Sequence, residues 1–271
     1  MNDMTEHNAC GVVFRTADRF SAAGGVVHGF STRLGGVSEG VWASMNLGLS
    51  RGDDPQRVRE NYRRFFAALG MDSSPTAVVR QVHGTHIHTI VPEDLTRDIF
   101  SPGSPEADGL ITHLSGVTLV VFTADCLPIL FYDPVCRVIC AVHAGWRGSV
   151  GGIASKAVKQ MEADYGCHPE HILAAMGPAI SRCHFETDGD VPAAVHSLLG
   201  SRGDACISHC PGGKFLVDLK EVNRLLLLDA GLSPCHITVD PDCTACQRDK
   251  YWSHRFTGFD RGSQAAVIRL L

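Results

Sequence analysis

The sequence lacks a long apolar run. Of its 271 residues 44% are hydrophobic, yet no continuous apolar stretch reaches the ~18–20 residues that a membrane-spanning helix needs. The first ten residues, MNDMTEHNAC, also lack a basic segment followed by an apolar core, which is the pattern of a secretory signal. We therefore expect a globular protein of the cytoplasm that has no contact with membranes.

An excess of positive charge is missing as well. The chain has 24 Lys and Arg against 29 Asp and Glu, so its formal net charge is -5. Proteins that bind nucleic acids neutralise phosphates with clustered Lys and Arg. The charge balance therefore argues against a nucleic-acid partner.

Cysteine, in contrast, is abundant, with eleven residues. An odd count without an export signal favours reduced thiols over a disulfide framework. Cys243 and Cys246 form a CxxC pair, which could be half of a structural zinc site or a redox pair. The spacing of Cys206 and Cys210 would suit the other half, but nothing else marks them as a zinc knuckle. A second zinc site is therefore not expected.

The most informative stretch is VTLVVFTADCLPILFYDPVCRVICAVHAGWRGSVGG, residues 117–152. Its β-rich runs are 117–122, 127–132 and 135–142. The last two are separated by Asp133-Pro134, a turn signal that predicts a hairpin. This hairpin would bring Cys126 and His143 to the same end of a two-stranded unit. A thiolate and an imidazole placed together can bind a metal or act as a nucleophile and its base.

Either kind of site needs a third partner, and His83 is the best candidate. It directly precedes Gly84 after a β-rich run, just as His143 lies at a strand end before Gly145. The alternative is that Cys126 is a small core residue and that the histidines are packed within the fold. The polar, glycine-rich segment after His143 favours a site, because a plain strand end would not need it.

Arg33 lies in a second glycine-rich polar segment, STRLGGVS, residues 31–38. Such a loop can reach into a site, or it can be an ordinary turn with a solvated arginine. The helix expected over 155–165 begins just after the glycines that follow His143. Its first backbone N–H groups would offer a seat for an anion such as phosphate.

The remaining pattern predicts an α/β fold of the mixed α+β kind. Asp54 before Pro55 is an N-terminal helix signal. Apolar spacing predicts helices over 55–69, 155–165, 191–199 and 219–230 and further strands over 12–14, 26–30, 171–176, 237–239 and 265–270. Strands outnumber what a simple alternation would require, so we expect a mixed sheet with helices packed outside. With no linker or internal repeat, residues 1–271 are predicted to form a single domain.

Several motifs, in this order, resemble the YfiH-type family, which is also called the laccase-domain or multicopper polyphenol oxidoreductase family. The motifs are Gln81-Val82-His83-Gly84, Thr123-Ala124-Asp125-Cys126-Leu127-Pro128 and His143-Ala144-Gly145-Trp146-Arg147-Gly148, with His28 to Ser38, Asn46 to Leu49, Gly177 to Ile180, Cys183, Cys243-Thr244 and Ser253 to Arg255. The resemblance covers nearly the whole chain. One departure is His184, where the family pattern suggests an aromatic residue or Cys.

The resemblance implies a single-domain α/β sandwich with a metal held by His83, Cys126 and His143. Two imidazoles and one thiolate leave a fourth position open, as in catalytic zinc sites. Zinc is therefore the expected cofactor, and copper is the alternative that the older family label suggests.

The resemblance also implies phosphorolysis of adenosine, inosine, guanosine and methylthioadenosine, together with deamination of adenosine. Purine nucleosides and phosphate are then the partners of a monomer or homodimer. The expected catalytic residues are Asp125, Arg33 and Arg147, and the expected substrate-binding residues are Arg33, Asn46, Gln81 and Arg147. In these roles the two arginines bind phosphate. Asp125 orients an imidazole ligand or transfers a proton.

Three alternatives remain. A copper polyphenol oxidase would need many His ligands, and among 14 His only His86 and His88 form a His-X-His pair. A cysteine hydrolase would use Cys126 as nucleophile and His143 as base, with Asp125 or His83 as orienter; some bacterial members of the family are linked to the editing of peptidoglycan precursors. A binding module without turnover is the third.

Overall fold

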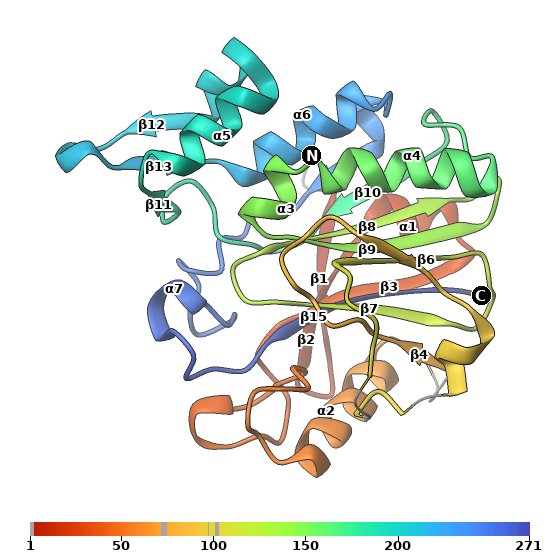
Figure 1. Ribbon diagram of the computed structural model, residues 1–271. Helices are drawn as coiled ribbons and strands as arrows, with labels where there is room; N and C mark the ends of the chain where they lie inside the picture. Colours follow the sequence, from red (N-terminus) through yellow and green to blue (C-terminus); the bar gives the residue numbers. More distant parts are fainter. Residues whose placement is uncertain (1–2, 72–74, 97, 101–102) are drawn as a thin grey trace.

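A computed structural model describes residues 3–71, 75–96, 98–100 and 103–271 of the chain (Figure 1). Two six-stranded sheets form its centre. Across the first sheet the strands follow the order β1 (Met4–Ala9), β2 (Val12–Ala17), β3 (Val26–Ser31), β15 (Gln264–Leu270), β7 (Thr118–Thr123) and β4 (Thr76–Ala77). Across the second sheet the order is β14 (Ile237–Val239), β10 (Leu173–Met176), β8 (Leu127–Asp133), β9 (Val138–Ala144), β6 (Gly109–Thr112) and β5 (Ile87–Thr89).

Both sheets are mixed. In the first, β4 pairs parallel to β7 whereas the other neighbours are antiparallel. In the second, β10–β14 and β5–β6 are the parallel pairs. A small third sheet contains β11 (Glu186–Thr187), β13 (Phe215–Val217) and β12 (Ile207–His209). The predicted mixed α+β architecture is confirmed.

Helices cover the outer faces of the two large sheets. Figure 1 shows α3 (Trp146–Val150), α4 (Ile153–Tyr165) and α6 (Leu219–Asp229) on one side and α2 (Pro55–Ala68) on the opposite side. The shorter or peripheral helices are α1 (Asp18–Ala23), α5 (Asp190–Leu199) and α7 (His254–Thr257), and 3₁₀ turns span Gly40–Trp42, Pro92–Thr96, Gly200–Cys206, Pro211–Gly213 and Pro234–His236. The described part of the chain contains no helix that is both long and apolar enough to cross a bilayer.

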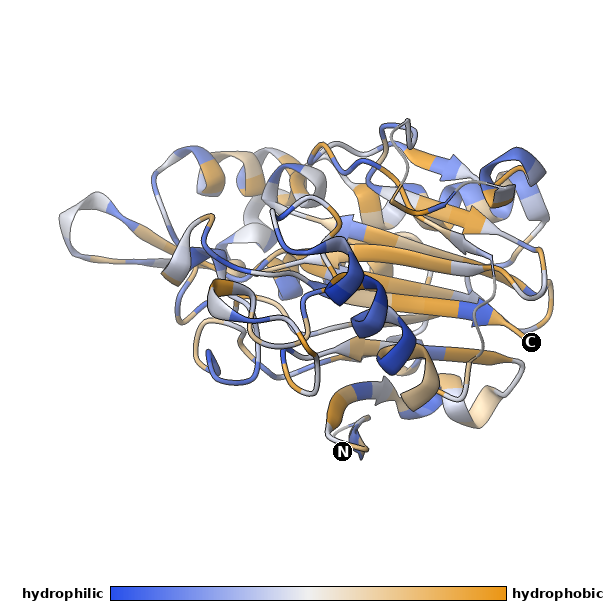
Figure 2. Ribbon diagram, turned by 90° about the horizontal axis from the view of Figure 1, so that it is seen from below, coloured by the Kyte–Doolittle hydropathy of each residue, from blue (hydrophilic) through white to orange (hydrophobic). Residues whose placement is uncertain are grey.

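The period-two alternation of β8 shows why this layering arises. Ile129 and Phe131 pack with α4 and α6 in the outer core, whereas Leu130 and Tyr132 pack between the two sheets. A strand that is buried on both faces needs apolar residues at every position. This explains the unbroken run that the sequence shows from Leu127 onward. Figure 2 shows mainly hydrophobic strands behind the largely hydrophilic helix α2.

The predicted hairpin is confirmed. Leu127 pairs with Ala144 and Asp133 pairs with Val138, so the ends that carry Cys126 and His143 do meet. The turn is longer than the sequence suggested, because β9 begins at Val138 rather than at residue 135. The Asp133 carboxylate accepts hydrogen bonds from the backbone N–H groups of Val135 and Cys136 within this turn.

Helix α2 begins as predicted, with the Asp54 side chain accepting a hydrogen bond from the N–H of Gln56. One polar residue on its inner face, Asn61, is completely buried. Its amide nitrogen donates to Ser38 Oγ at 2.8 Å and to Asn46 O at 2.8 Å, and its oxygen accepts from Val37 N at 2.8 Å. Asn61 thereby fixes the loop after β3 to the helix.

Replacement of Asn61 by Ala should destabilise the protein by about 3 kcal/mol, since several buried polar groups would lose their partner. Arg63→Ala is the matched control on the same helix. Arg63 is exposed and pairs with Glu60, so its loss should leave the free energy of unfolding nearly unchanged. Urea unfolding measures both variants. Equal effects would show that the Asn61 contacts do not stabilise the fold.

Candidate metal-binding active site

Two of the three expected ligands lie where the chain crosses from one sheet to the other. Residues 124–126 connect β7 of the first sheet to β8 of the second, and they include Cys126. The connection from β4 to β5 crosses in the same direction and includes His83. His143 lies near the end of β9, opposite Pro128. The packing of the two sheets therefore determines where these side chains meet.

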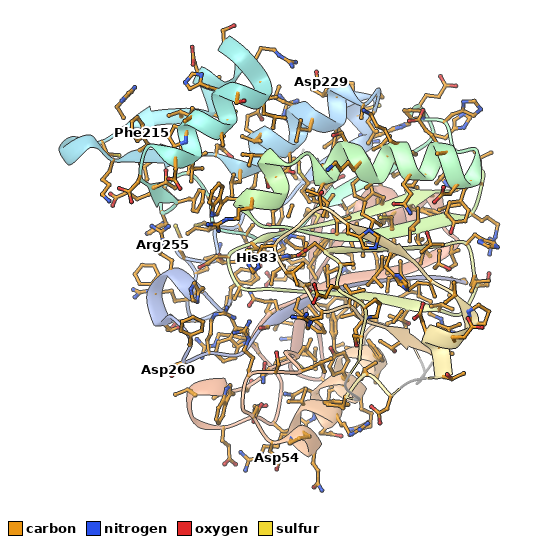
Figure 3. All side chains as sticks on the ribbon, viewed as in Figure 1. Asp54, His83, Phe215, Asp229, Arg255 and Asp260 are labelled. Carbon is orange, nitrogen blue, oxygen red and sulfur yellow. The ribbon has the colours of Figure 1, made fainter. Side chains whose placement is uncertain are left out.

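The three side chains converge on one point. His83 Nε2 lies 4.0 Å from Cys126 Sγ, and the rings of His83 and His143 have centroids 4.9 Å apart. One ligand atom from each residue lies within 4.8 Å of the other two. Figure 3 labels His83 near the middle of the molecule, between the upper helices and α2. The trio predicted from the sequence is thus brought together.

Gly145 is required by this convergence. A Cβ atom at this position would lie 3.0 Å from the His83 ring, 3.3 Å from Cys126 Sγ and 3.6 Å from the His143 ring. A side chain would therefore crowd His83 and Cys126, and it would also touch His143. The glycine that follows the His143 strand allows the backbone to approach the site closely.

A fully buried carboxylate, that of Asp108, organises the histidines. Its Oδ1 lies 2.9 Å from His143 Nδ1 and accepts a hydrogen bond from His83 N at 2.9 Å. Its Oδ2 accepts from Gly84 N at 2.6 Å and from Val82 N at 3.2 Å. With Nδ1 of His143 occupied, its Nε2 is left for Cys126 or a metal. A carboxylate behind a histidine ligand is typical of metal sites.

Asp108 was not among the residues predicted from the sequence. In the sequence, the only feature that marks this residue is its position directly before Gly109. Gly109 is the first residue of β6, the strand that pairs with β9. The expected orienting residue was Asp125, but the structure shows Asp108 bonded to His143.

Asp125 holds a different part of the site. Its backbone has the positive φ of 84°, which a non-glycine residue adopts rarely. Its carboxylate accepts hydrogen bonds from Thr244 Oγ1 at 2.6 Å, Ser253 Oγ at 3.1 Å and Arg255 N at 2.6 Å. These contacts fasten the turn before Cys126 to the segment that leads into α7, where Figure 3 labels Arg255.

The charges within the trio favour an ion pair in the protein alone. Burial raises the pKa of the Cys126 thiol, but the neighbouring His143 and His83 outweigh it and lower this pKa to about 6. Burial lowers the pKa of His143, whereas Cys126 and Asp108 outweigh it and raise this pKa to about 9. A thiolate therefore faces an imidazolium. The thiolate is the form of Cys that binds metals and attacks electrophiles.

A cavity of about 520 Å³ adjoins the trio. Its lining includes His83, Cys126, His143 and the predicted residue Gln81. The Gln81 amide donates to Phe122 O at 2.8 Å and accepts from Phe122 N at 2.7 Å, which fixes it to β7. The volume lies in the range of pockets for small organic ligands.

Three arginines, none of them among the residues predicted from the sequence, also line the cavity. Arg80 pairs with Glu106, whereas Arg51 and Arg261 have no such acidic partner among the described ion pairs. Arg261 is only 6% exposed, and its Nε has no hydrogen-bond partner among the described residues. Burial and the charge of Arg51 lower the pKa of Arg261 to about 10. The positive charges of Arg51 and Arg261 repel each other. An anion bound in the cavity would reduce this repulsion, so the pair favours anion binding.

The arginines expected from the sequence lie outside the cavity lining. Arg33 donates to the carbonyl oxygens of Ala43 at 2.7 Å and Arg248 at 3.0 Å, and its guanidinium stacks 3.9 Å from the Trp252 ring centroid. Arg147 is exposed and lies over the ring of Trp146. A phosphate-binding role for either residue stays a prediction.

Asn46 holds two segments of the cavity wall in place. It is completely buried, and its Oδ1 accepts from Gly48 N at 2.9 Å and Ser263 N at 3.0 Å. Gly48 and Ser263 both line the cavity, whereas Asn46 does not appear in that lining. Its predicted contact with substrate likewise stays a prediction.

The donor set fits a metal ion. One thiolate and two imidazoles suit zinc, and three protein ligands leave one coordination position for substrate. The buried carboxylate behind His143 supports the same assignment. His83, Cys126 and His143 are the residues that would hold the ion.

The fold and the site define a class of α+β sandwich proteins with a His–Cys–His centre beside a cavity. The chain belongs to the family described as multi-copper polyphenol oxidoreductase laccase, whose model matches residues 27–271. This confirms the resemblance found in the sequence.

Named relatives support the assignment. The chain is 36% identical over 249 residues to a protein named purine nucleoside phosphorylase YlmD of Geobacillus stearothermophilus, covering 91% of this chain and 90% of that one. It is 32% identical to purine nucleoside phosphorylase LACC1 of Mus musculus, covering 90% of this chain but only 55% of that protein. The crystal structure of YlmD from G. stearothermophilus superposes with a TM-score of 0.92 at 33% identity, covering 100% and 99% of the two chains.

Asp108→Asn should weaken metal binding by roughly 10–100-fold, the usual effect of losing a carboxylate behind a histidine ligand. Asp125→Asn is the comparison, and it should weaken binding less because the Asp125 carboxylate contacts neither imidazole. Competition with a chromophoric chelator measures both affinities. A larger loss for Asp125→Asn would assign the orienting role to Asp125 after all.

Proposed function

We propose that this protein is a zinc-dependent purine nucleoside phosphorylase. Adenosine, inosine, guanosine and methylthioadenosine are its proposed substrates, and deamination of adenosine is a side activity. The observation that carries the proposal is the cavity beside the His83–Cys126–His143 trio, which is also lined by the buried Arg261 and the half-buried Arg51. The names of the relatives point to the same chemistry.

Phosphorolysis joins a phosphate oxygen to C1′ of the ribose and breaks the bond from C1′ to N9 of the purine. The electron pair of that bond leaves with the base. Arg51 and Arg261 hold the phosphate, because their guanidinium groups line the cavity and lack an anionic side chain as a hydrogen-bond partner among the described residues. A bound zinc ion supplies a Lewis acid beside the nucleoside.

The protein's own residues then have positioning tasks. Asp108 keeps Nε2 of His143 directed at the site, and the backbone amides that it binds fix the His83 loop. Asp125 keeps Cys126 in place through its bonds to Thr244, Ser253 and Arg255.

The copper oxidase alternative has weaker support. Among the described residues, the groups able to hold a metal contain at most two histidines. A multicopper cluster needs more imidazole ligands than that.

One observation favours a second candidate, a cysteine hydrolase. Cys126, His143 and Asp108 form a chain of contacts in which a thiolate faces an imidazolium and a carboxylate orients the ring. This is the arrangement of a Cys–His–Asp triad. His83 distinguishes the two functions, because only the metal site requires it as a ligand.

Replacing His83 by Ala should remove the zinc ion of the trio, so that the zinc content falls by one ion per chain, together with phosphate-dependent release of hypoxanthine from inosine. One of three protein ligands would be lost, and metal affinity would fall severely. Elemental analysis and a nucleoside assay measure the two signals. If the zinc content and turnover both equalled those of the unmodified protein, His83 would be no part of the site. If activity persisted after the loss of that one ion, the triad would be the better description.

Arg261→Gln should raise the KM for phosphate at least tenfold, since a charge-assisted contact contributes about 1.5–3 kcal/mol. Deamination of adenosine needs no phosphate and should change less. The comparison variant is Arg33→Ala, which should lower the melting temperature because it loses its bonds to two carbonyl groups. An increase in phosphate KM for Arg33→Ala but not for Arg261→Gln would restore the role predicted for Arg33.

A further inference from the structure

A second group of metal-ligating side chains lies on two loops beside the first site. Cys183 and His184 follow β10, and Cys243 and Cys246 follow β14. These two strands are parallel neighbours, with Met176 paired to Val239. Their carboxyl ends therefore meet at one edge of the sheet, and the two loops start side by side.

The distances within this group are those of a tetrahedral site. Cys183 Sγ lies 3.5 Å from Cys246 Sγ. His184 Nδ1 lies 3.2 Å from Cys183 Sγ, 3.3 Å from Cys246 Sγ and 3.9 Å from Cys243 Sγ. A zinc ion at about 2.3 Å from sulfur and about 2.0 Å from nitrogen sets its ligand atoms roughly 3.5–3.8 Å apart. The observed separations agree with this within a few tenths of an ångström.

The backbone around Cys243 is built to support a thiolate. Its Sγ accepts a hydrogen bond from Ser181 N at 3.3 Å, and the N–H groups of Ala245 and Cys246 point at the same sulfur. The N–H of Thr244 donates to Ala179 O at 3.2 Å and joins the two loops. Hydrogen bonds to ligand atoms of this kind orient a metal site.

We propose that Cys183, His184, Cys243 and Cys246 bind a structural zinc ion, distinct from the ion at the catalytic trio. Four protein ligands complete the coordination of zinc and leave no position for substrate. Each thiol gives up its proton to solvent as it binds. Cys183 and Cys246 are exposed, so an ion can reach the site from solvent.

The CxxC pair thus has a different second half from the one considered in the sequence. The structure groups Cys183 and His184 with it rather than Cys206 and Cys210. The sequence does not group Cys183 and His184 with the CxxC pair, because 58 residues, 185–242, separate them from Cys243.

The second zinc stabilises the support of the catalytic turn. Thr244, next to the ligand Cys243, donates to Asp125, and so do Ser253 and the N–H of Arg255 farther along the same segment. Asp125 precedes the catalytic ligand Cys126. Zinc at the second site ties this segment to the loop after β10, so its loss should lower the thermal stability of the whole site.

The experiment counts zinc in protein that has been stripped of metal and reconstituted with zinc sulfate. The unmodified protein should bind two ions per chain, whereas Cys246→Ser and Cys183→Ser should each bind one and melt at a lower temperature. His83→Ala should also bind one, because it loses the other ion. The double variant His83→Ala with Cys246→Ser should bind none. Cys10→Ser and Cys235→Ser, which remove exposed thiols outside both groups, should keep two.

Substitution with cobalt tests the second site alone when the first site has been removed by His83→Ala. There Co²⁺ should give the absorption of a tetrahedral thiolate complex, and this should disappear when Cys246→Ser is added. Two zinc ions retained in both Cys246→Ser and Cys183→Ser would overturn the proposal. So would a thiol count that shows a disulfide within the group in the reconstituted protein. Neither result bears on the first site, whose zinc is reported by His83→Ala alone.

Discussion

The site depends on one buried negative charge, the carboxylate of Asp108. A buried carboxylate is costly unless its lone pairs are satisfied, and this one is bonded to the ring of His143 and to three consecutive backbone N–H groups. The same interaction therefore fixes the orientation of one ligand and the conformation of the loop that carries another. His83 adopts a positive φ of 61°, and the bond from its N–H to Asp108 helps to hold that conformation. Without Asp108, no side chain would link the His143 ring to the loop that carries His83.

A second carboxylate, that of Asp125, supports the turn that leads to the third member of the trio, Cys126. Asp125 connects the turn before Cys126 to Thr244, Ser253 and Arg255, and two ligands of the proposed second site, Cys243 and Cys246, lie on the same segment. Two centres thus share one structural support. In the proposed form, the catalytic ion sits where the chain crosses between sheets, and the structural ion closes the loops at the edge of the second sheet. The order of the first site then depends in part on the second.

The geometry also explains why one set of residues suggests two kinds of chemistry. Cys126, His143 and Asp108 satisfy the contacts of a nucleophilic triad, yet they equally form two members of a metal site with its supporting carboxylate. In the proposed function, His83 is the additional ligand that makes these residues a metal site. The arginines give a further distinction. The buried Arg261 and the half-buried Arg51 beside the cavity favour an anionic second substrate, and phosphate meets that requirement. An acyl hydrolase whose second substrate is water has no such requirement.

The hairpin of β8 and β9, the N-terminal cap of helix α2 and the candidate trio His83, Cys126 and His143 could all be predicted from the sequence. These follow from local signals, because apolar period, turn residues and glycine-flanked histidines are properties of short stretches. The positions of Asp108, Arg51 and Arg261 at the site could be recognised only in the tertiary structure. Each lies far along the chain from the groups that it serves, and a single acidic or basic residue carries no local mark of its partner. For the same reason, the sequence did not predict that Cys183 and His184 lie beside the CxxC pair. Only the parallel pairing of β10 with β14 brings the two loops together.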